Sequence, residues 1–355
     1  MRQESKNILL IQLGDIGDVV LSIPAFLTVK KNYPEANIVI AVREKAKELV
    51  QYLDGVHDVI SINQDARSFF DEIRYQRAFF SRARGYHFDL AFDFRTGTRG
   101  AVLAFLSGAR ERVSFLDHDS FWRNKLFTTL YPIDYHLPQY VADYYLSLPL
   151  AYGLKEHKSP PVIQITSSME ERAKEILDQE KICPAKPVIA IQPFSLWRYK
   201  EWDIEKYIQL IQRIIIEYGF TIVLTGSRDE YGRMQMIVDE FRETGHPVRN
   251  LAGKTTLAEL AAILKLCRLL IGSDSAGMHI AAAVETPTVI IFGPSSPESW
   301  APRGDMHTIV QKEMSCVPCR QKGCDGGGIS RCLDELEVNE VFSVIRSHLE
   351  KKHEG

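Results

Sequence analysis

A run of small and helix-capping residues, Gly272–Gly277, lies where a predicted strand turns into a predicted helix in the second half of the chain. The free N–H groups and the positive dipole end of a helix N-terminus favour phosphate, and small side chains let a diphosphate approach the backbone. A plainly capped helix would need the same residue types, so the turn alone leaves both interpretations open. The candidate phosphate-binding residues are Asp274, Ser275, Ala276, Gly277 and His279.

Three further strand ends in this half carry hydroxyl, small or charged residues. Because the carboxyl ends of parallel strands meet at one edge of a sheet, we expect these turns to converge with Gly272–Gly277. A lysine there can neutralise phosphate charge, although a solvated loop lysine would look the same. The residues are Ser195 and Lys200 after the strand Val188–Gln192, Gly226 and Glu230 after Phe220–Leu224, and Gly293 and Ser295 after Thr288–Phe292.

The first half has a different kind of turn, Gly14-Asp15-Ile16-Gly17-Asp18, which offers carboxylates instead of cations. An aspartate that faces a substrate can remove a proton from a hydroxyl group. Aspartate at such a position more often caps the helix that follows. With two aspartates in the turn, one can cap while the other acts as a base.

Strands alternate with helices along both halves, which predicts an α/β protein with mostly parallel sheets covered on both faces. Prolines interrupt this pattern near the middle, and a new strand begins at Val188. We therefore expect two Rossmann-like domains that face each other across a cleft. The predicted boundaries are 1–165 for the first domain, 185–335 for the second, and 336–355 for a C-terminal helix that packs back toward the first domain.

The ordered set of motifs resembles the bacterial lipopolysaccharide heptosyltransferases, glycosyltransferase family nine, which have the GT-B fold. The resemblance covers nearly the whole chain. It rests on Gly14–Ala25, on Lys200-Glu201-Trp202, on Asp274–Ala283 and on Phe292-Gly293-Pro294-Ser295. Each motif alone is weak, but their order is specific.

This resemblance implies an inverting transfer of heptose from ADP-heptose to a hydroxyl of the lipopolysaccharide inner core. By position, Asp18 matches the general base and Lys200 the lysine that stabilises the donor phosphate. Ser275–His279 match the diphosphate-binding helix start, Asp274 lies beside the sugar, and Glu230 matches an acidic residue near the ribose. No cofactor is expected for catalysis, because a lysine and a helix N-terminus can stabilise the leaving ADP.

The acceptor is expected to be a lipid-linked acidic saccharide, which arginines in the first domain would bind. A solvated helix face would explain the same arginines. The candidate acceptor-binding residues are Gly14, Gly17, Arg74, Arg77 and Arg95.

Composition limits the location and the partners of the protein. The net charge of −3 argues against a nucleic-acid partner. The sequence shows no signal peptide and no apolar run long enough to cross a membrane. We expect a cytoplasmic enzyme that makes peripheral contact with the cytoplasmic face of the inner membrane, where its acceptor would lie.

Four of the six cysteines are clustered within seventeen residues near the C-terminus, whereas Cys183 and Cys267 are isolated. The first pair has the Cys-x2-Cys spacing of metal sites, but the later spacings fit no standard zinc ribbon. The cluster is a candidate structural metal site, with reduced or redox-active thiols as the alternative, and we assign it no catalytic role. Its members are Cys316, Cys319, Cys324 and Cys332.

Two other functions fit the same architecture. A sugar-nucleotide epimerase would need more acid and base groups than Asp18 supplies. A non-catalytic sugar-nucleotide-binding protein would have no need of both Asp18 and Lys200. A nicotinamide dehydrogenase is disfavoured because the full glycine fingerprint of dinucleotide binding is missing.

Overall fold

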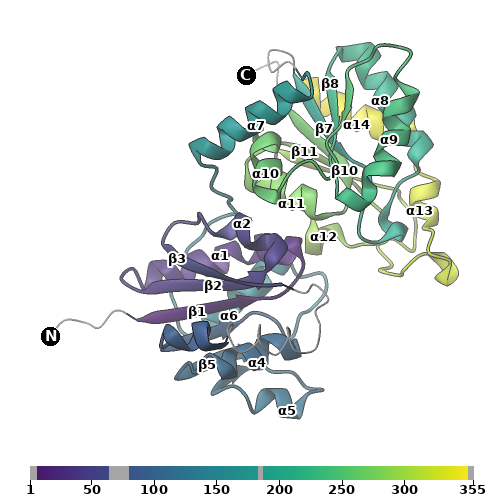
Figure 1. Cartoon of the computed structure of the whole chain (residues 1–355). Helices are drawn as coiled ribbons and strands as arrows, with labels where there is room; N and C mark the ends of the chain where they lie inside the picture. Colours follow the sequence, from purple (N-terminus) through teal and green to yellow (C-terminus); the bar gives the residue numbers. More distant parts are fainter. Residues whose placement is uncertain (1–5, 64–79, 183–186, 351–355) are drawn as a thin grey trace, which may run out of the picture. The chain divides into compact units, whose positions relative to one another are not determined.

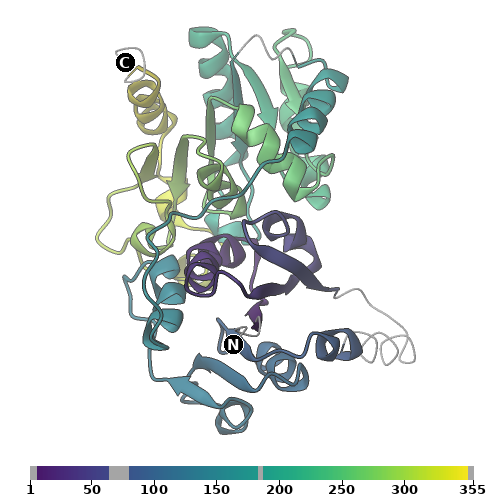
Figure 2. The same cartoon turned by 90° about the vertical axis from the view of Figure 1, so that its left-hand side faces the viewer.

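The computed structural model describes residues 6–63, 80–182 and 187–350. The chain forms two compact units, Met1–Gln164 and Ile165–Gly355. Each unit contains a six-stranded sheet whose strands are all parallel (Figures 1 and 2). This agrees with the predicted fold class of α/β domains with parallel sheets.

The sheet of the first unit has the strand order β3-β2-β1-β4-β5-β6. On β1, Leu9 and Ile11 pack in a cluster that includes residues of α4, and the alternate residues Ile8 and Leu10 are equally buried. Because successive side chains of a strand point to opposite faces, both faces of this sheet are covered. The elements are β1 (Asn7–Gln12), α1 (Ile16–Asn32), β2 (Asn37–Arg43), α2 (Lys47–Val50), β3 (Val56–Ile62), β4 (Leu90–Asp93), α4 (Thr98–Leu106), β5 (Glu111–Phe115), α5 (Phe121–Asn124), β6 (Thr129–Tyr131) and α6 (Val141–Ala151).

The sheet of the second unit has the order β12-β11-β10-β7-β8-β9, which is the same topology once the strands are renumbered from β7. Its elements are α7 (Ser167–Gln179), β7 (Val188–Gln192), α8 (Ile204–Tyr218), β8 (Thr221–Leu224), α9 (Tyr231–Glu240), β9 (Val248–Asn250), α10 (Leu257–Leu266), β10 (Leu269–Ser273), α11 (Ala276–Ala283), β11 (Thr288–Phe292), α12 (Pro297–Trp300), β12 (His307–Gln311), α13 (Arg331–Asp334) and α14 (Val338–Glu350). Three short 3-10 turns lie at 198–200, 228–230 and 324–326.

Local chemistry explains where the long helices of this unit begin and end. The Asp203 carboxylate accepts hydrogen bonds from the N–H groups of Glu205 and Lys206 and so caps α8, and Gly219, at φ 66°, ends that helix in the left-handed region. Thr256 and Glu259 form a capping box at the start of α10.

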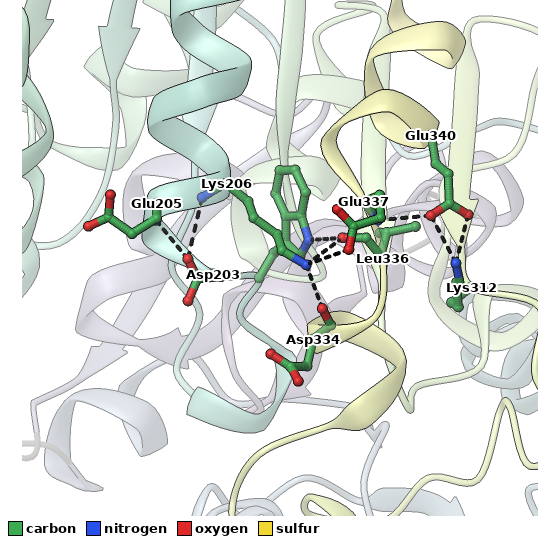
Figure 3. A network of polar contacts seen from close by, with 9 residues as sticks. Asp203, Glu205, Lys206, Lys312, Asp334, Leu336, Glu337 and Glu340 are labelled. Atoms are coloured by element: carbon green, nitrogen blue, oxygen red, sulfur yellow. Dashed lines mark hydrogen bonds and ion pairs between the residues drawn. The ribbon is translucent and has the colours of Figure 1, made fainter.

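The C-terminal helix α14 packs on the hydrophobic core of the second unit. Its buried residues Val341, Phe342 and Ile345 belong to the hydrophobic core of the second unit. Figure 3 shows the polar contacts that hold the segment before it: the Lys206 amino group of α8 donates to the carbonyl oxygens of Asp334 and Leu336. The apolar face of α14 is thus used within its own unit.

Candidate functional site

Both sheets reverse their strand order at one point, between β1 and β4 in the first unit and between β7 and β10 in the second. Ligands of such sheets bind outside the carboxyl ends of the strands at this switch point. Asp18 and Arg95 follow β1 and β4, and Lys200 and Asp274 follow β7 and β10. Each unit therefore has a candidate site at its own switch point.

The Asp18 carboxylate in the first unit is nearly buried and accepts three hydrogen bonds. Its Oδ1 accepts from the Tyr145 hydroxyl at 2.7 Å, and its Oδ2 accepts from the Asp15 N–H and from Arg95 Nη1, each at 2.8 Å. Burial, and then the Asp18 carboxylate, raise the pKa of Tyr145 well above its usual value, so the phenol keeps its proton and donates. Asp15 occupies the N-cap position of α1 and pairs with Arg43 at the surface.

Hydrogen bonds of Gln12, the fully buried last residue of β1, stabilise the turn that carries Asp18. The Gln12 side-chain oxygen accepts from the Gly14 N–H at 3.1 Å, and its amide nitrogen donates to the Ser22 hydroxyl at 2.6 Å. A Cβ on Gly14 would come within 2.5 Å of Asp18 Oδ2. Glycine at this position therefore leaves room for the Asp18 carboxylate and for the guanidinium of Arg95.

A buried ion pair fixes the main chain of Arg95. The Arg95 N–H donates to Asp93 Oδ1 at 3.3 Å, and Arg123 Nη2 donates to the Arg95 carbonyl at 2.8 Å. Asp93 and Arg123 are almost completely buried, with 3.6 Å between Oδ2 and Nη2. Burial raises the pKa of Asp93 to about 7, because the opposing effect of Arg123 is smaller.

In the second unit, Lys200 and Asp274 form an ion pair of 2.7 Å, and the Asp274 side chain is only 5% exposed. The Ser195 hydroxyl donates to the Asp274 carbonyl at 3.1 Å, and the Ser195 N–H donates to Glu201 Oε1 at 3.2 Å. Arg233 pairs in turn with Glu201 at 2.6 Å. These contacts bring the predicted residues Ser195, Lys200 and Asp274 together at the switch point.

The start of α11 has two buried polar atoms, the Ser275 hydroxyl oxygen and the Gln192 side-chain oxygen, without a hydrogen-bond partner in the described part of the chain. The amide end of the Gln192 side chain lies where a Cβ on Gly277 would be, so any larger residue there would displace it. Ala276 is partly exposed as the first residue of the helix, whereas His279 is 5% exposed. The helix start can present its backbone N–H groups to an anion, but His279 is far less accessible than the sequence suggested.

The other predicted donor contacts have structural roles in the second unit. The Glu230 carboxylate accepts from the N–H and the hydroxyl of Ser227, at 2.6 and 2.9 Å, and so caps the turn before α9. A Cβ on Gly226 would meet Glu230, and one on Gly293 would meet Leu333. Gln311 binds the carbonyl oxygens of Gly293 and Ser295, at 2.8 and 3.2 Å.

Of the predicted acceptor-binding residues, Arg95 and Gly14 lie at the Asp18 site, and Gly17 is partly exposed in the first turn of α1. Arg74 and Arg77 lie outside the described residues, as does Cys183. Sequence reasoning missed Tyr145, which is 127 residues from Asp18 and carries no local signal.

The four clustered cysteines line one small cavity of about 50 Å³. None of them forms a disulfide. Burial and the neighbouring thiols Cys319 and Cys324 raise the pKa of Cys332 to about 11. Within residues 6–63, 80–182 and 187–350, no group of three or more His, Cys, Asp or Glu side chains is arranged to hold a metal. The thiols line one cavity but are not arranged as metal ligands in the described residues. The structure therefore adds no support to the predicted structural metal site. The cysteines are Cys316, Cys319, Cys324 and Cys332.

Comparison with known proteins gives a consistent result. The model of glycosyltransferase family 9 (heptosyltransferase) matches residues 76–329. Lipopolysaccharide heptosyltransferase 3 of Escherichia coli K12 is 28% identical, and the match covers 81% of this chain and 82% of that protein. Lipooligosaccharide heptosyltransferase 2 of Haemophilus influenzae is 26% identical, and the match covers 97% of this chain and 100% of that protein.

Among solved structures, the ADP-heptose lipopolysaccharide heptosyltransferase II of Escherichia coli has a TM-score of 0.81 at 21% identity and covers 98% of this chain and 99% of its own. This likeness confirms the expected fold. The family model spans well over half of the chain and includes Lys200, Asp274 and the start of α11. The chain therefore belongs to glycosyltransferase family 9, the heptosyltransferase family, and is a glycosyltransferase.

Proposed function

We propose that this glycosyltransferase moves heptose from ADP-heptose to a hydroxyl of a lipid-linked, acidic lipopolysaccharide inner-core acceptor, with inversion at the anomeric carbon. The observation that carries the proposal is the buried Asp18 carboxylate at the switch point of the first sheet. Inversion needs one base and one in-line displacement. Family membership and the cation at the other switch point support the donor half of the proposal.

In this mechanism Asp18 accepts the proton of the acceptor hydroxyl. The oxygen of that hydroxyl attacks the anomeric carbon at the same time. The bond from that carbon to the diphosphate breaks, and ADP leaves with the electron pair. Lys200 and the backbone N–H groups at the start of α11 stabilise the charge that grows on the leaving group. We propose that no cofactor takes part in catalysis.

Nucleotide calorimetry and product analysis test this function. We expect ADP to bind at least tenfold more tightly than UDP or GDP, and ADP-heptose to be consumed rapidly only when the acceptor is present. The anomeric configuration of the product, measured by NMR, should be opposite to that of the donor. A preference for UDP would contradict the donor assignment, and a retained configuration would contradict the single displacement.

The location proposed for the enzyme is the cytoplasmic face of the inner membrane. No helix within the described residues is long and apolar enough to cross a membrane. On α5, Phe121 is 74% exposed and Trp122 52% exposed, and the Lys125 ammonium lies 4.4 Å from the centre of the Phe121 ring. Exposed aromatics beside a cation suit an anionic bilayer surface.

Vesicle sedimentation tests this location. The variant F121S/W122S should lose binding to anionic vesicles, while I216S, which removes an equally exposed apolar residue of α8, should keep it. Equal binding by wild type and F121S/W122S would contradict a role of α5.

A further inference from the structure

Within the described residues, the hydrogen bonds to the Asp18 carboxylate all come from the first unit, and they leave one lone pair, on Oδ1, without a donor. Oδ2 accepts from the Asp15 N–H and from Arg95, so both of its lone pairs are occupied. Within the described residues, Oδ1 accepts from the Tyr145 hydroxyl alone and keeps one lone pair, but this bond is buried, whereas the two bonds to Oδ2 are part-buried. Oδ2 is therefore the oxygen on the more accessible side of the carboxylate. As the structure stands, Oδ2 cannot accept a proton from a hydroxyl until one of its two donors moves.

The donors to this carboxylate differ in their freedom to move. The Tyr145 ring is buried on α6 at 6% exposure, and the Asp15 N–H belongs to the backbone at the start of α1. Arg95 has a fixed main chain, but its side chain is 42% exposed. Its guanidinium has five N–H donors, and the bond to Asp18 is its one hydrogen bond within the described residues. Arg95 is thus the donor that can leave.

We propose that Arg95 blocks Oδ2 of Asp18 in the free enzyme and that an anionic group of the acceptor draws the guanidinium away, so that this oxygen can act as the base only when the acceptor is bound. Tyr145 is the positioning residue that keeps the carboxylate in place when Arg95 moves. This inference rests on the proposed function. The guanidinium suits the task because its planar fork binds a carboxylate or phosphate in two-point contact.

Such a block would protect the donor from water. If Asp18 were free while ADP-heptose was bound, water could take the place of the acceptor hydroxyl. Its oxygen would bond to the anomeric carbon, its proton would pass to Asp18, and ADP would leave with the electron pair, giving free heptose. Holding Oδ2 with Arg95 suppresses this reaction until the intended hydroxyl arrives.

The first experiment measures release of ADP from ADP-heptose without an acceptor. In R95Q we expect this rate to rise at least fivefold, and in D18N/R95Q to fall back to or below the wild-type rate. The matched control is R110Q, which removes an exposed arginine paired with Asp89 before β4 and should release ADP as wild type does. R95A serves as a second variant with the same expectation.

The same variants are then compared on an acidic acceptor and on one from which the anionic groups have been removed. For R95Q the KM of the acidic acceptor should rise about tenfold, whereas the KM of the neutral acceptor should equal that of wild type. An R95Q protein that binds ADP normally but shows no rise in ADP release without acceptor would overturn the proposal. So would an equal rise of KM for both acceptors.

The role of Tyr145 is tested by Y145F against Y152F, which removes a hydroxyl bonded at 2.7 Å to Glu111 at the C-cap of the same helix. Y145F should lower kcat about tenfold and leave the KM of the donor unchanged, and Y152F should leave both unchanged. An unchanged kcat in Y145F would contradict the positioning role. A wild-type enzyme that failed to use ADP-heptose at all would instead overturn the proposed function.

Discussion

The two units share one topology but place opposite charges at equivalent positions. In the first, the carboxylate of Asp18 follows the first strand of the 3-2-1-4-5-6 order and the cation of Arg95 follows the fourth. In the second, the cation of Lys200 follows the first strand and the carboxylate of Asp274 follows the fourth. The same fold thus carries an aspartate–arginine pair with one order along the chain and a lysine–aspartate pair with the opposite order.

The strands that precede the two sites, β1 and β7, each end in a glutamine. The side chains of these two glutamines differ in their hydrogen bonds. Gln12 uses both ends of its side-chain amide to hold the turn of Asp18. Gln192 has a buried side-chain oxygen without a hydrogen-bond partner in the described residues. The side chains around Asp18 bond to one another, whereas Gln192 and Ser275 near α11 have buried oxygens for which the described part of the chain supplies no donor.

The largest effect is expected at the base. D18N should lower kcat by about 10²- to 10⁴-fold, because an amide cannot accept the proton of the hydroxyl. The affinity for ADP, measured by calorimetry, should stay that of wild type, since Asp18 belongs to the first unit. D15N, in the same turn but exposed and paired with Arg43, is the control and should keep most of its turnover. A normal kcat in D18N would refute the base assignment.

Removing the cation of the second unit should have a somewhat smaller effect on turnover and, unlike D18N, should weaken ADP binding. K200A loses a donor to the leaving group, which commonly costs about 3–4 kcal/mol of barrier. It also leaves the buried Asp274 carboxylate unpaired. K254A, which removes a surface lysine paired with Glu180, is the control.

A double variant separates the two causes. In K200A/D274N the unpaired buried charge is gone, so ADP affinity should recover in part while kcat stays low. If K200A bound ADP and turned over normally, Lys200 would be a structural partner of Asp274 and nothing more.

The sequence predicted the fold and the positions of the charged residues better than it predicted their contacts. Strand and helix periodicity placed Asp18, Lys200 and Asp274 after the strands that meet at the two switch points. The short strands β5, β6, β9 and β12 were not identified, because strands of three to five residues carry little periodic signal.

Contacts between distant segments could not be predicted either. The pairing of Asp18 with Tyr145 and the burial of Arg123 beside Asp93 depend on how α6 and α5 pack. Glu230, which was expected at a ribose, forms a capping box with Ser227 in the structure, and the spacing of these two residues was a signal of this cap in the sequence.

Substitutions of two glycines, one in each unit, should have effects of intermediate size. G277A places a methyl group on the amide of the partly buried Gln192 side chain and should lower the free energy of unfolding by about 1–3 kcal/mol. G14A meets Asp18 and the tip of Arg95 instead, so it should lower kcat more than stability. G232A, in α9 with open space around it, is the control and should be neutral or slightly stabilising. Equal losses of stability in G277A and G232A would show that Gln192 moves aside freely.

Asp93 ends β4 in the first unit, and Ser273 ends the equivalent strand β10 in the second. Because Asp93 carries a carboxyl group and Ser273 does not, we predict a pH dependence of the free energy of unfolding that is specific to the first unit. Burial raises the pKa of Asp93 to about 7 from 3.8 in the unfolded chain, so the folded state binds more protons between these values. Stability from this residue is fully present below pH 3.8 and is lost as pH rises through 7, at up to about 1.4 kcal/mol per pH unit. The free energy of unfolding, measured with denaturant for D93N and for wild type, should differ between the two proteins with this slope against pH. A flat difference for D93N would contradict a buried, titrating Asp93.

The second unit should respond to pH in the opposite direction and more weakly. Burial, and then His348, lower the pKa of His307 to about 4 from 6.5, so here the unfolded chain binds more protons between these values. The stability from His307 is present above pH 6.5 and is lost as pH falls toward 4. Its ring is only partly buried and bonds to the Thr288 hydroxyl at 3.0 Å, which limits the size of the effect. The variant H307Q should be less sensitive to acid than wild type over this range, measured by the same unfolding curves. If H307Q and D93N changed the pH profile in the same direction, the two units would not differ in the way that their buried groups indicate.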